Sequence, residues 1–304
     1  MINNSPNIDS SSTPLAQGAL SSTDSVQRQS LSTPLAQHTA SHPFPPRAVC
    51  LGHVGIIGLS GRMGQRIMSA LEKQGGFQSI LGYGRPSDEP GQNGDFCASL
   101  DELFEKSSLV IDFSTPILFP DILDAALKNP KPMVIGTTGI DPHILGGIAA
   151  IGVPIVVAPN TSLGAVIQRW MAGKLASVLP NAYDIDIVEH HHRHKKDIPS
   201  GTANALADAI MGAKKDRGLD ICTGSTTSPR QDGRIEMHGL RCGHVFGMHE
   251  VIWTGTDDRL VLGHTVFSPH IFADGAVALA RWVMNGQKPG IYGAEDALGL
   301  SNLV

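Results

Sequence analysis

The stretch of residues best suited to chemistry is Glu189–Ala203, with the sequence EHHHRHKKDIPSGTA. Histidine can donate a proton near neutral pH. Lys195 follows His191 by four residues and supplies a positive charge for an anionic substrate. The segment Pro199–Ala203 is typical of a helix start, where free N–H groups bind an anion. A proton donor, a cation and a carboxylate cradle in one short segment indicate the reduction of a small dicarboxylate.

Two other interpretations of this stretch stay open. Histidine-rich runs can bind metal. However, only His190, His192 and His194 would share one face of an extended strand, and no cysteine or carboxylate ligand set accompanies them. A run of basic residues is also often a solvated loop. We expect no metal site here and favour the catalytic interpretation.

A second candidate site is the glycine-rich segment Gly58–Gly64, GLSGRMG, which lies between an apolar strand and a helical pattern. Glycine permits a tight turn and lets the backbone approach a pyrophosphate, which then binds at the N-terminus of the following helix. The spacing is G-x-x-G-x-x-G instead of G-x-G-x-x-G, so the loop alone is a weaker signal. Its strand–loop–helix context favours a dinucleotide site over an ordinary glycine-rich turn.

The residues after the second strand bear on the choice of cofactor. In NAD-binding folds an acidic residue there holds the ribose 2′-hydroxyl, but this chain has Gly84 at that position, followed by Arg85. An arginine without a carboxylate beside it suits a 2′-phosphate. We therefore expect NADPH to be favoured over NADH. The alternatives are that Arg85 is a solvated loop residue, or that Asp88 reaches into the site.

Short apolar runs alternate with helical patterns between residues 48 and 162. The first run is Val54–Ile57, and later ones end near Tyr83, Phe113 and Ala158. Strands that alternate with helices at this spacing predict βαβ units and a parallel sheet covered on both faces. The expected fold class is therefore α/β, with a Rossmann-like parallel sheet in this part of the chain.

The following part of the chain, 163–271, has a different pattern. A long helix is expected over Ser162–Leu179. The residues of Tyr183–His192 alternate, which places Glu189 and His191 on the same face of a strand. Because later segments alternate too, we expect an α+β domain whose mixed or antiparallel sheet is buried on one face.

The first 47 residues are dominated by Ser, Thr, Pro, Gln and Asn, and they contain the hexapeptide STPLAQ twice. The segment has too few large apolar residues to offset the entropy that is lost when a chain is ordered. We therefore expect a disordered extension. The segment lacks the apolar core of a secretory signal. A transit peptide is the alternative, but Arg28 and Arg47 are its only positive side chains, and Asp9 and Asp24 balance them.

The composition argues against several classes of protein. The net charge of −5 and the isoelectric point near 6.2 give no electrostatic reason to expect nucleic acid as a partner. No apolar run approaches the roughly 20 residues that cross a bilayer, so we expect no membrane span. The four cysteines are scattered without C-x-x-C spacing. This usage is typical of reduced thiols in a cytoplasmic enzyme.

The stretch Glu189–Ala203 resembles the signature E-x-H-H-x-x-K-x-D-x-P-S-G-T-A of the 4-hydroxy-tetrahydrodipicolinate reductase family, with a match at every fixed position. Gly58–Gly64 is similar to the nucleotide loop of that family. The sequences GTTG at 136–139 and APN at 158–160 are similar to two loops that line its nicotinamide. The resemblance covers residues 50 to 304. It implies NADPH- or NADH-dependent formation of tetrahydrodipicolinate in the diaminopimelate route to lysine.

The resemblance also implies a role for individual residues. His191 would be the proton donor, and Lys195 would polarise the substrate and neutralise developing charge. His192, Gly201 and Thr202 would hold a carboxylate of the dicarboxylate substrate. The cofactor-binding residues would be Gly58, Leu59, Ser60, Gly61, Arg62, Met63, Arg85, Gly136, Thr137, Thr138, Ala158, Pro159, Asn160 and Thr161.

The domain organisation implied by the resemblance has three parts. Residues 1–47 are the disordered extension. Residues 48–162 form the dinucleotide-binding domain, and residues 272–304 return to it with a closing helix expected near Asp274–Asn285. Residues 163–271 form a substrate-binding domain whose sheet builds a homotetramer.

Besides His190, which occupies a variable position of the signature, the chain departs from the family pattern at two places. Pro269 and His270 occupy the region in which the family commonly has an arginine, and Thr161 stands where it often has an aromatic residue. Neither departure removes the proton donor, the lysine or the carboxylate cradle. Two other functions stay open: a related reductase that acts on another small amino dicarboxylate, and a regulator that binds NADP(H) without turnover.

Overall fold

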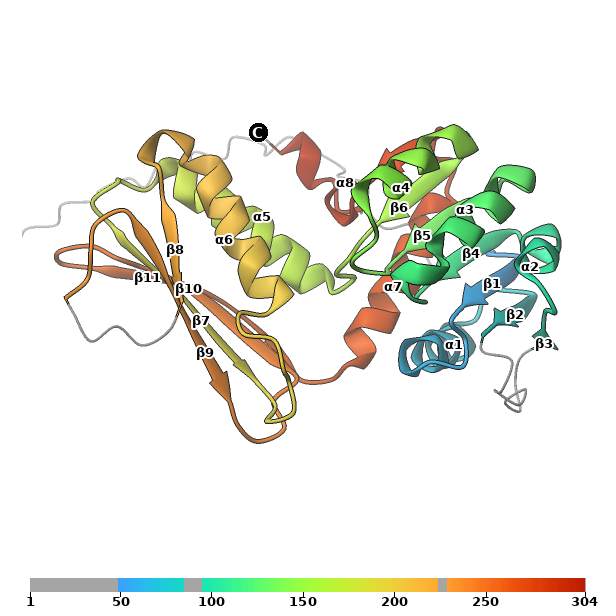
Figure 1. Cartoon of the computed structure of the whole chain (residues 1–304), viewed down its shortest axis with the longest axis horizontal. Helices are drawn as coiled ribbons and strands as arrows, with labels where there is room; N and C mark the ends of the chain where they lie inside the picture. Colours follow the sequence, from blue (N-terminus) through green and yellow to red (C-terminus); the bar gives the residue numbers. More distant parts are fainter. Residues whose placement is uncertain (1–48, 85–94, 224–228, 304) are drawn as a thin grey trace, which may run out of the picture. The chain divides into compact units, whose positions relative to one another are not determined.

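A computed structural model of the chain describes residues 49–84, 95–223 and 229–303 (Figure 1). The extension predicted for residues 1–47 lies outside this range, and so do Arg85 and Asp88. All of the described residues belong to one compact unit of the chain. Within that unit the strands form two separate sheets.

The first sheet has seven strands, all paired in parallel, in the order β12-β6-β5-β4-β1-β2-β3. Such a sheet is buried on both faces, which is why its central strands are almost continuously apolar. The strand order changes direction between β1 and β4, because β2 and β3 lie on one side of β1 and β4 to β6 on the other. The strands are β1 His53–Ile57, β2 Ser79–Tyr83, β3 Asp95–Phe96, β4 Leu109–Asp112, β5 Met133–Ile135, β6 Pro154–Val157 and β12 Gly290–Tyr292.

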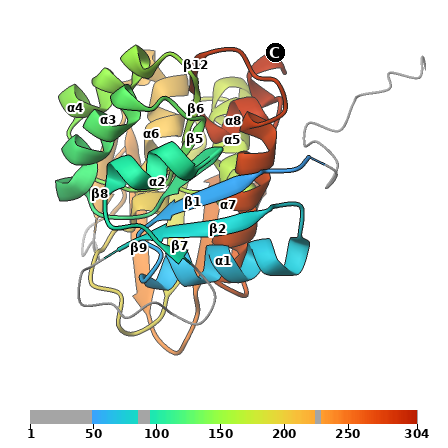
Figure 2. The same cartoon turned by 90° about the vertical axis from the view of Figure 1, so that its right-hand side faces the viewer.

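Helices cover both faces of this sheet (Figure 2). Helices α1 and α7 share one hydrophobic core with Ile56 and Ile111, whereas α2 and α3 share the opposite core with Ile57 and Val110. Neighbouring residues of one strand thus contribute to opposite cores, as the alternation of a strand requires. The helices are α1 Arg62–Gln74, α2 Leu100–Lys106, α3 Phe119–Lys128, α4 Pro142–Gly146, α7 His270–Val283 and α8 Ala294–Ala297, with 3₁₀ turns at Pro116–Leu118, Gly147–Ile151 and Leu300–Asn302.

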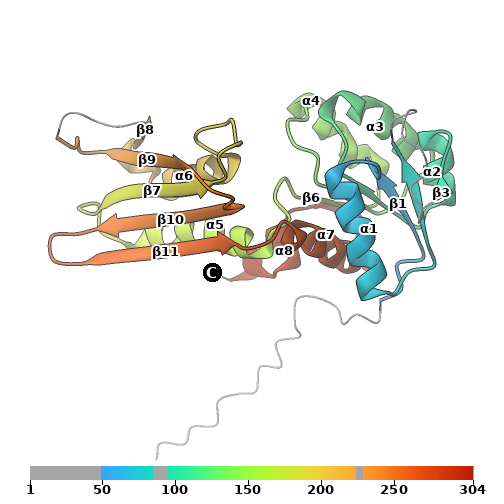
Figure 3. The same ribbon diagram turned by 90° about the horizontal axis from the view of Figure 1, so that it is seen from below.

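The second sheet has five strands in the order β11-β10-β7-β9-β8 (Figure 3). It is mixed, because β9 pairs in parallel with β7 and β8, while β10 pairs antiparallel with β7 and β11. Helices α5 and α6 cover one face and bury a core around Trp253 and Ile187. The elements are α5 Leu163–Val178, β7 Asp184–His191, α6 Gly201–Ala213, a 3₁₀ turn at Lys215–Arg217, β8 Asp220–Thr223, β9 Arg234–Arg241, β10 Gly247–Thr254 and β11 Arg259–Val266.

The expected fold class is confirmed, with a parallel α/β sheet followed by a mixed sheet. The alternation predicted for β7 is also confirmed, because every second residue of the strand, including Glu189 and His191, is buried on the face under the helices. The closing helix begins at His270, earlier than its predicted start at Asp274, because Pro269 fits the backbone at a helix start. No helix in the described ranges is long and apolar enough to cross a membrane.

The chain crosses between the two sheets twice. It leaves the first sheet after β6 through residues 158–162, which lead into α5. It returns after β11 through residues 267–269, which lead into α7. The start of α6, one of the predicted functional segments, lies near the first crossing. Asn160 Nδ2 in the crossing donates to Thr202 Oγ1 at 3.3 Å.

Candidate active site

The first part of the site is the loop between β1 and α1. Gly58 has φ +84°, a left-handed conformation that glycine adopts without strain. A Cβ atom on Gly64 would lie 2.6 Å from Leu59 Cα, so α1 approaches the loop at a distance that glycine alone permits. Helix α1 begins after Gly61, which has no side chain with which to cap it. Its first N–H groups are therefore available to an anion, which fits a cofactor pyrophosphate.

The cofactor residues predicted from the sequence follow three of the parallel strands. Residues 58–63 follow β1, residues 136–138 follow β5, and residues 158–161 follow β6. Strand β1 borders β4 at the point where the strand order changes direction, and α/β sheets bind ligands outside the carboxyl ends of their strands at such a point. The structure therefore gathers these three loops at the end of the sheet where a dinucleotide is expected.

The sequence did not single out Asp112, the buried last residue of β4. Its Oδ1 accepts hydrogen bonds from Ser114 N at 3.0 Å and from Ser114 Oγ at 2.6 Å, and Ser114 N also donates to Thr137 Oγ1 at 2.9 Å. Burial raises the pKa of Asp112, and these hydrogen bonds oppose the rise. This group connects the loops after β4 and β5. The sequence feature that could have identified Asp112 is an acidic residue at the end of an apolar strand.

A cavity of about 600 Å³ lies beside the loop that follows β6. All five residues that were expected to be catalytic or to bind substrate line it: His191, Lys195, His192, Gly201 and Thr202. Four expected cofactor residues also line it: Thr138, Ala158, Pro159 and Asn160. The structure thus brings the end of β7, the start of α6 and two cofactor loops to one cavity.

Among the described cofactor residues, those of the β1–α1 loop do not line this cavity, nor do Gly136, Thr137 and Thr161. Thr161 is buried, and its hydroxyl donates to the carbonyl of Phe272 at 2.7 Å. A Cβ atom on Gly275 would collide with the Thr161 carbonyl. Thr161 therefore packs the crossing segment against α7. This contact gives a structural reason for a small hydroxyl residue at that position.

The expected carboxylate cradle is at the start of α6, which has the geometry of an open helix terminus. Ser200 is the N-cap, and its Oγ accepts from Ala203 N at 3.2 Å. A Cβ atom on Gly201 would meet nothing within 4 Å among the described residues, so the first turn of α6 opens onto the cavity. The free N–H groups and the helix dipole there attract a carboxylate.

The basic side chains beside the cradle have different partners. Lys195 Nζ lies 2.8 Å from Asp197 Oδ2, and this hydrogen bond lowers the pKa of Asp197. Partial burial, together with the positive charges of neighbouring side chains, lowers the pKa of His192. The cavity is thus lined by Lys195, which is held beside Asp197, and by His192, whose charged form is disfavoured by its surroundings.

The histidine-rich run does not form the metal-binding face considered above. Strand β7 ends at His191, so His190, His192 and His194 do not follow one another on a strand face. His190 Nε2 lies 2.9 Å from Cys242 Sγ instead. The described residues bring a different trio together: Glu189, His191 and His249 offer ligand atoms within 4.8 Å of one another.

This buried trio is better explained as an ion-pair cluster than as a metal site. Arg241 Nη2 donates to Glu189 Oε1 at 2.7 Å, so a guanidinium already holds the only carboxylate of the trio. Glu189 is the first residue of the Glu189–Ala203 motif, but no role was expected for its side chain. His249 and Arg241 carried no local signal, because they come from other strands, β10 and β9.

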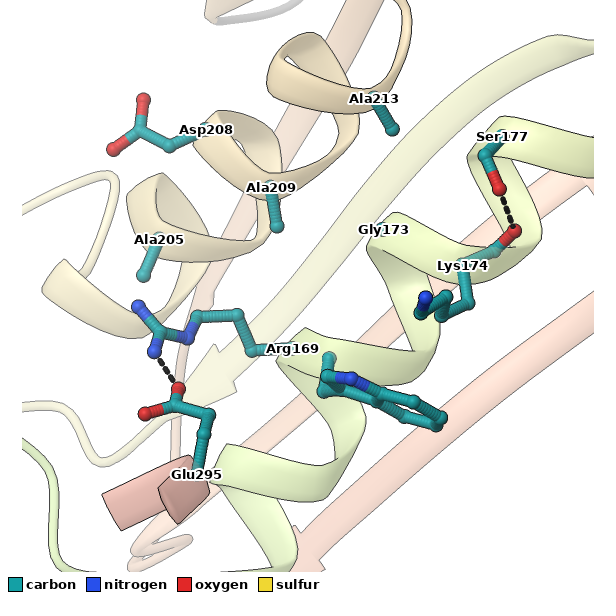
Figure 4. Close-up of a pocket in the computed structure, with 10 residues that line it drawn as sticks. Arg169, Gly173, Lys174, Ser177, Ala205, Asp208, Ala209, Ala213 and Glu295 are labelled. Atoms are coloured by element: carbon teal, nitrogen blue, oxygen red, sulfur yellow. Dashed lines mark hydrogen bonds and ion pairs between the residues drawn. The ribbon is translucent and has the colours of Figure 1, made fainter. Parts of the chain in front are cut away.

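Arg169 is a further cation of the cavity that sequence reasoning missed. It comes from α5 and forms an ion pair with Glu295 of α8, and both residues line the cavity. They also line a second, more open cavity of about 660 Å³ between α5 and α6, which contains Lys174 and Asp208 (Figure 4). The Arg169–Glu295 pair therefore lies between the two cavities.

Comparison with known proteins identifies the family. Residues 52–161 match the family model for the N-terminus of dihydrodipicolinate reductase, and residues 164–298 match the model for its C-terminus. The chain belongs to the dihydrodipicolinate reductase family. It is therefore an oxidoreductase of a family that uses a nicotinamide cofactor, and the resemblance noted in the sequence is confirmed.

Individual relatives agree with this assignment. The 4-hydroxy-tetrahydrodipicolinate reductase of Zymomonas mobilis is 40% identical over 252 residues, which cover 81% of this chain and 97% of that protein. The enzyme of the same name from Chlamydia felis is 38% identical over 256 residues, covering 82% of this chain and 99% of that protein. The match thus spans nearly the whole of each relative.

Solved structures support the fold. A dipicolinate-bound dihydrodipicolinate reductase from Paenisporosarcina sp. TG-14 superposes with a TM-score of 0.68 at 24% identity, covering 80% of this chain and 98% of that one. A probable dehydrogenase from Thermotoga maritima has a TM-score of 0.54 at 12% identity, covering 81% of this chain and 92% of that one. Both likenesses concern the arrangement of the elements alone.

Proposed function

We propose that this chain reduces 4-hydroxy-tetrahydrodipicolinate to tetrahydrodipicolinate, in the diaminopimelate route to lysine, and that it does so in the cavity at the end of β7. The observation that carries the proposal is the meeting of three groups in that cavity: the cofactor loop at Asn160, the pair His191 and Lys195, and the open first turn of α6. Membership of the dihydrodipicolinate reductase family points to the same reaction.

Each group has a separate task in this reaction. The first turn of α6, with Gly201, Thr202 and His192, binds a carboxylate of the substrate, and Lys195 balances the negative charge that develops as the bond is reduced. The nicotinamide cofactor supplies the hydride when it is bound. The 4-hydroxyl group of the substrate leaves as water, which gives the unsaturated dicarboxylate that takes the hydride, and His191 donates the proton that completes the reduction. The protein contributes mainly position and charge, because the cofactor carries the hydride chemistry.

A dicarboxylate requires more positive charge than one helix terminus supplies. Lys195 meets part of this need, and Arg169 is the other fixed cation lining the same cavity. Arg169 is paired with Glu295, so it is held at the wall and its charge is partly balanced there. We assign to it the attraction of the second carboxylate. The apolar side chains Phe246 and Phe272 complete the wall and limit access of water.

NADPH is the favoured cofactor in this proposal. A Cβ atom on Gly84 would lie 2.6 Å from Ser60 Oγ, so a side chain at the position that carries an acidic residue in NAD-binding folds would require the Ser60 hydroxyl to turn away. Without a carboxylate there, a 2′-phosphate meets no repulsion, and Arg85 is next in the sequence to attract it. The expected result is a higher kcat/KM with NADPH than with NADH.

We propose that the chain forms a homotetramer in which one face of the second sheet contacts other subunits. Helices α5 and α6 cover only one face, and the other carries the apolar side chains Leu240, Val261 and Ile252, of which Leu240 is 51% and Val261 42% exposed. These apolar side chains share the face with charged ones such as Asp186 and Glu250, and a mixed apolar and polar face suits an interface between subunits. Sedimentation equilibrium should give four times the chain mass of 32.1 kDa. A monomer at micromolar concentration would refute this assembly.

Two further expectations complete the proposal. The four cysteines, Cys50, Cys97, Cys222 and Cys242, form no disulfide with one another. Free thiols suit a reducing compartment, so we place the enzyme in the cytoplasm. The partner that the site fits is a small dicarboxylate. We expect neither nucleic acid nor a membrane as a partner.

A coupled assay tests the proposed function. Dihydrodipicolinate synthase generates the unstable substrate from pyruvate and aspartate semialdehyde, while absorbance follows the oxidation of NADPH or NADH. We expect rapid oxidation that requires every component, with NADPH used more efficiently. If folded protein that binds the cofactor oxidises neither, the proposed reaction is wrong. If NADH is much the better cofactor, the interpretation of Gly84 and Arg85 is wrong.

A further inference from the structure

A buried cluster of charged and polar side chains lies behind the proposed proton donor. Its centre is Glu189, whose side chain is 2% exposed, and His191 and His249 lie beside it, with side chains 8% and 4% exposed. His249 of β10 is the direct partner of Glu189 in the antiparallel register with β7. Arg241 of β9 is the partner of His191 in the parallel register. The pairing of three strands therefore assembles the cluster.

The Glu189 carboxylate is surrounded by donors. Arg241 Nη2 donates to its Oε1 at 2.7 Å, and Ser200 N lies 3.1 Å from Oε1 and 3.2 Å from Oε2. His191 Nδ1 lies 3.3 Å from Oε2. Burial by itself would raise the pKa of Glu189, but the contacts with His191, His249, Ser200 and Arg241 outweigh burial and hold that pKa well below its usual range. Glu189 is therefore a carboxylate at any pH at which the enzyme works.

His249 connects the same carboxylate to helix α6. Its Nε2 lies 3.0 Å from Oγ of Ser200, the N-cap of α6, and 3.6 Å from Glu189 Oε2. Its ring meets the His191 ring edge to face, with centroids 5.0 Å apart. Burial lowers the pKa of His249, so this residue is neutral and acts through its shape and its hydrogen bond.

Two glycines on neighbouring strands leave room for this arrangement. A Cβ atom on Gly239 of β9 would lie 3.2 Å from Glu189 Oε1, and a Cβ atom on Gly247 of β10 would lie 3.3 Å from His191 Nε2. Both distances are shorter than ordinary van der Waals contacts. Each member of the Glu189–His191 pair therefore depends on a residue without a side chain beside it.

We propose that Glu189 is a positioning residue that fixes the proton donor and the carboxylate cradle relative to each other, with His249 as a brace between them; this role rests on the proposed function of His191. The Glu189 carboxylate lies 3.3 Å from His191 Nδ1 and so favours a proton on that nitrogen, which leaves Nε2 as the nitrogen that serves the cavity. In the reaction the Nε2–H bond breaks, the proton forms a bond with the substrate, and the neutral imidazole keeps its Nδ1–H directed at Glu189.

The carboxylate also favours the charged form of the donor. The titratable and charged groups around His191 are Glu189 on its own strand, Arg241 on β9, His249 on β10, and His192 and Lys195 in the following loop. Of these, Glu189 alone is an anion. Its removal leaves the imidazolium among positive groups.

The first test is the pH dependence of kcat for Glu189→Gln. Since the donor must be protonated, activity falls on the alkaline side of the profile. Because the variant lacks the anion 3.3 Å from His191, we expect the midpoint of that fall to move to lower pH and kcat at neutral pH to fall about 100-fold, the lower end of a general acid's contribution. The control is Glu72→Gln, the same change at an exposed position of α1. A folded Glu189→Gln enzyme with an unmoved alkaline midpoint overturns the proposal.

Two further variants separate charge from packing. Glu189→Asp keeps the charge but shortens the side chain, so kcat should fall while the alkaline midpoint stays; wild-type kcat would contradict positioning. This variant also serves if Glu189→Gln does not fold. His249→Gln removes a neutral brace, so the midpoint should stay while the KM for the dicarboxylate rises. An unchanged KM would show that His249 does not help to position the carboxylate cradle.

A measurement that does not need turnover distinguishes failure of this inference from failure of the proposed function. Nitrogen chemical shifts of isotope-labelled histidine report which ring nitrogen carries the proton, and His191→Gln identifies the His191 signal. We expect the Nδ1–H tautomer in the wild type and a loss of that preference in Glu189→Gln. The Nε2–H tautomer in the wild type would overturn the inference, whether or not the enzyme reduces the proposed substrate.

Discussion

The Nδ1 atom of His191 lies 3.3 Å from the Oε2 atom of Glu189, and both side chains are buried. The same carboxylate accepts the N–H of Ser200, the residue that caps α6. One anion thus contacts both the proposed proton donor and the start of the proposed substrate cradle. Catalysis by positioning requires such a fixed relation, because a shift of about 1 Å can cost about 100-fold in rate.

Gly247→Ala tests whether the space beside His191 matters. The added Cβ would lie 3.3 Å from His191 Nε2, so the ring or the strand must shift by a few tenths of an ångström. We expect kcat in the coupled assay to fall about tenfold, less than the 100-fold of a full misplacement, with little change in melting temperature. Gly212→Ala is the control, because a Cβ there meets no described atom within 4 Å. Equal activities of the two variants would contradict the prediction.

Lys195→Gln tests the charge opposite the developing anion. A charge-assisted hydrogen bond contributes about 1.5–3 kcal/mol, so we expect kcat/KM for the dicarboxylate to fall by about 10- to 100-fold. The neighbouring Lys196→Gln is the matched control, because Lys196 is exposed and does not line the cavity. Similar losses in both variants would indicate a general effect of net charge instead of a specific contact.

Arg169→Gln tests the second cation. If Arg169 attracts the other carboxylate in the ground state and in the transition state alike, KM for the substrate should rise about tenfold while kcat stays nearly constant. Lys174→Gln serves as the control, because Lys174 lines the second cavity and not the first (Figure 4). An unchanged KM in Arg169→Gln would show that Arg169 does not attract the substrate and that its contact is the ion pair with Glu295.

Asp112→Asn tests the buried carboxyl at the end of β4. Because the folded pKa of Asp112 is raised, its contribution to stability is fully present below the unfolded value of about 3.9 and is lost as the pH rises through the folded value. The amide keeps the acceptor for Ser114, so we expect the variant to melt about 2–4 °C higher at pH 8, the change for about 1 kcal/mol. That gain should shrink as the pH falls.

The control for this measurement is Asp124→Asn, at an exposed position of α3. Melting curves are recorded without cofactor, because Asp112 lies beside the cofactor loops and bound cofactor would stabilise the folded state by itself. A variant that is less stable than the wild type at pH 8, or a gain that does not depend on pH, would contradict the sign of the shift.

The local parts of the site could be predicted from the sequence. The motif from Glu189 to Ala203 indicated the donor, the lysine and the helix start, and the alternation of β7 indicated that Glu189 and His191 share a face. These inferences need only the period of a strand and the properties of a helix terminus. The glycine spacing of the β1–α1 loop could be interpreted from the sequence because it is also a local pattern at a helix start.

The partners of these residues could not be predicted, because they depend on the pairing of distant strands. His249 lies opposite Glu189 only because β10 pairs with β7 in one register, and a slip of one residue would turn it to the other face. The roles of Gly239 and Gly247 depend on the same register. Arg169 and Glu295 come from helices attached to different sheets, so no local pattern connects them.

The most direct test of the central claim is the coupled assay of His191→Gln beside the wild type, at saturating NADPH and varied substrate. The account predicts rapid, substrate-dependent oxidation of NADPH by the wild type. In the variant, kcat should fall by about 100-fold or more, with little change in KM or in NADPH binding, as expected when an interaction of the transition state is lost. A folded His191→Gln enzyme with wild-type kcat would show that the proton comes from another group and would contradict the account.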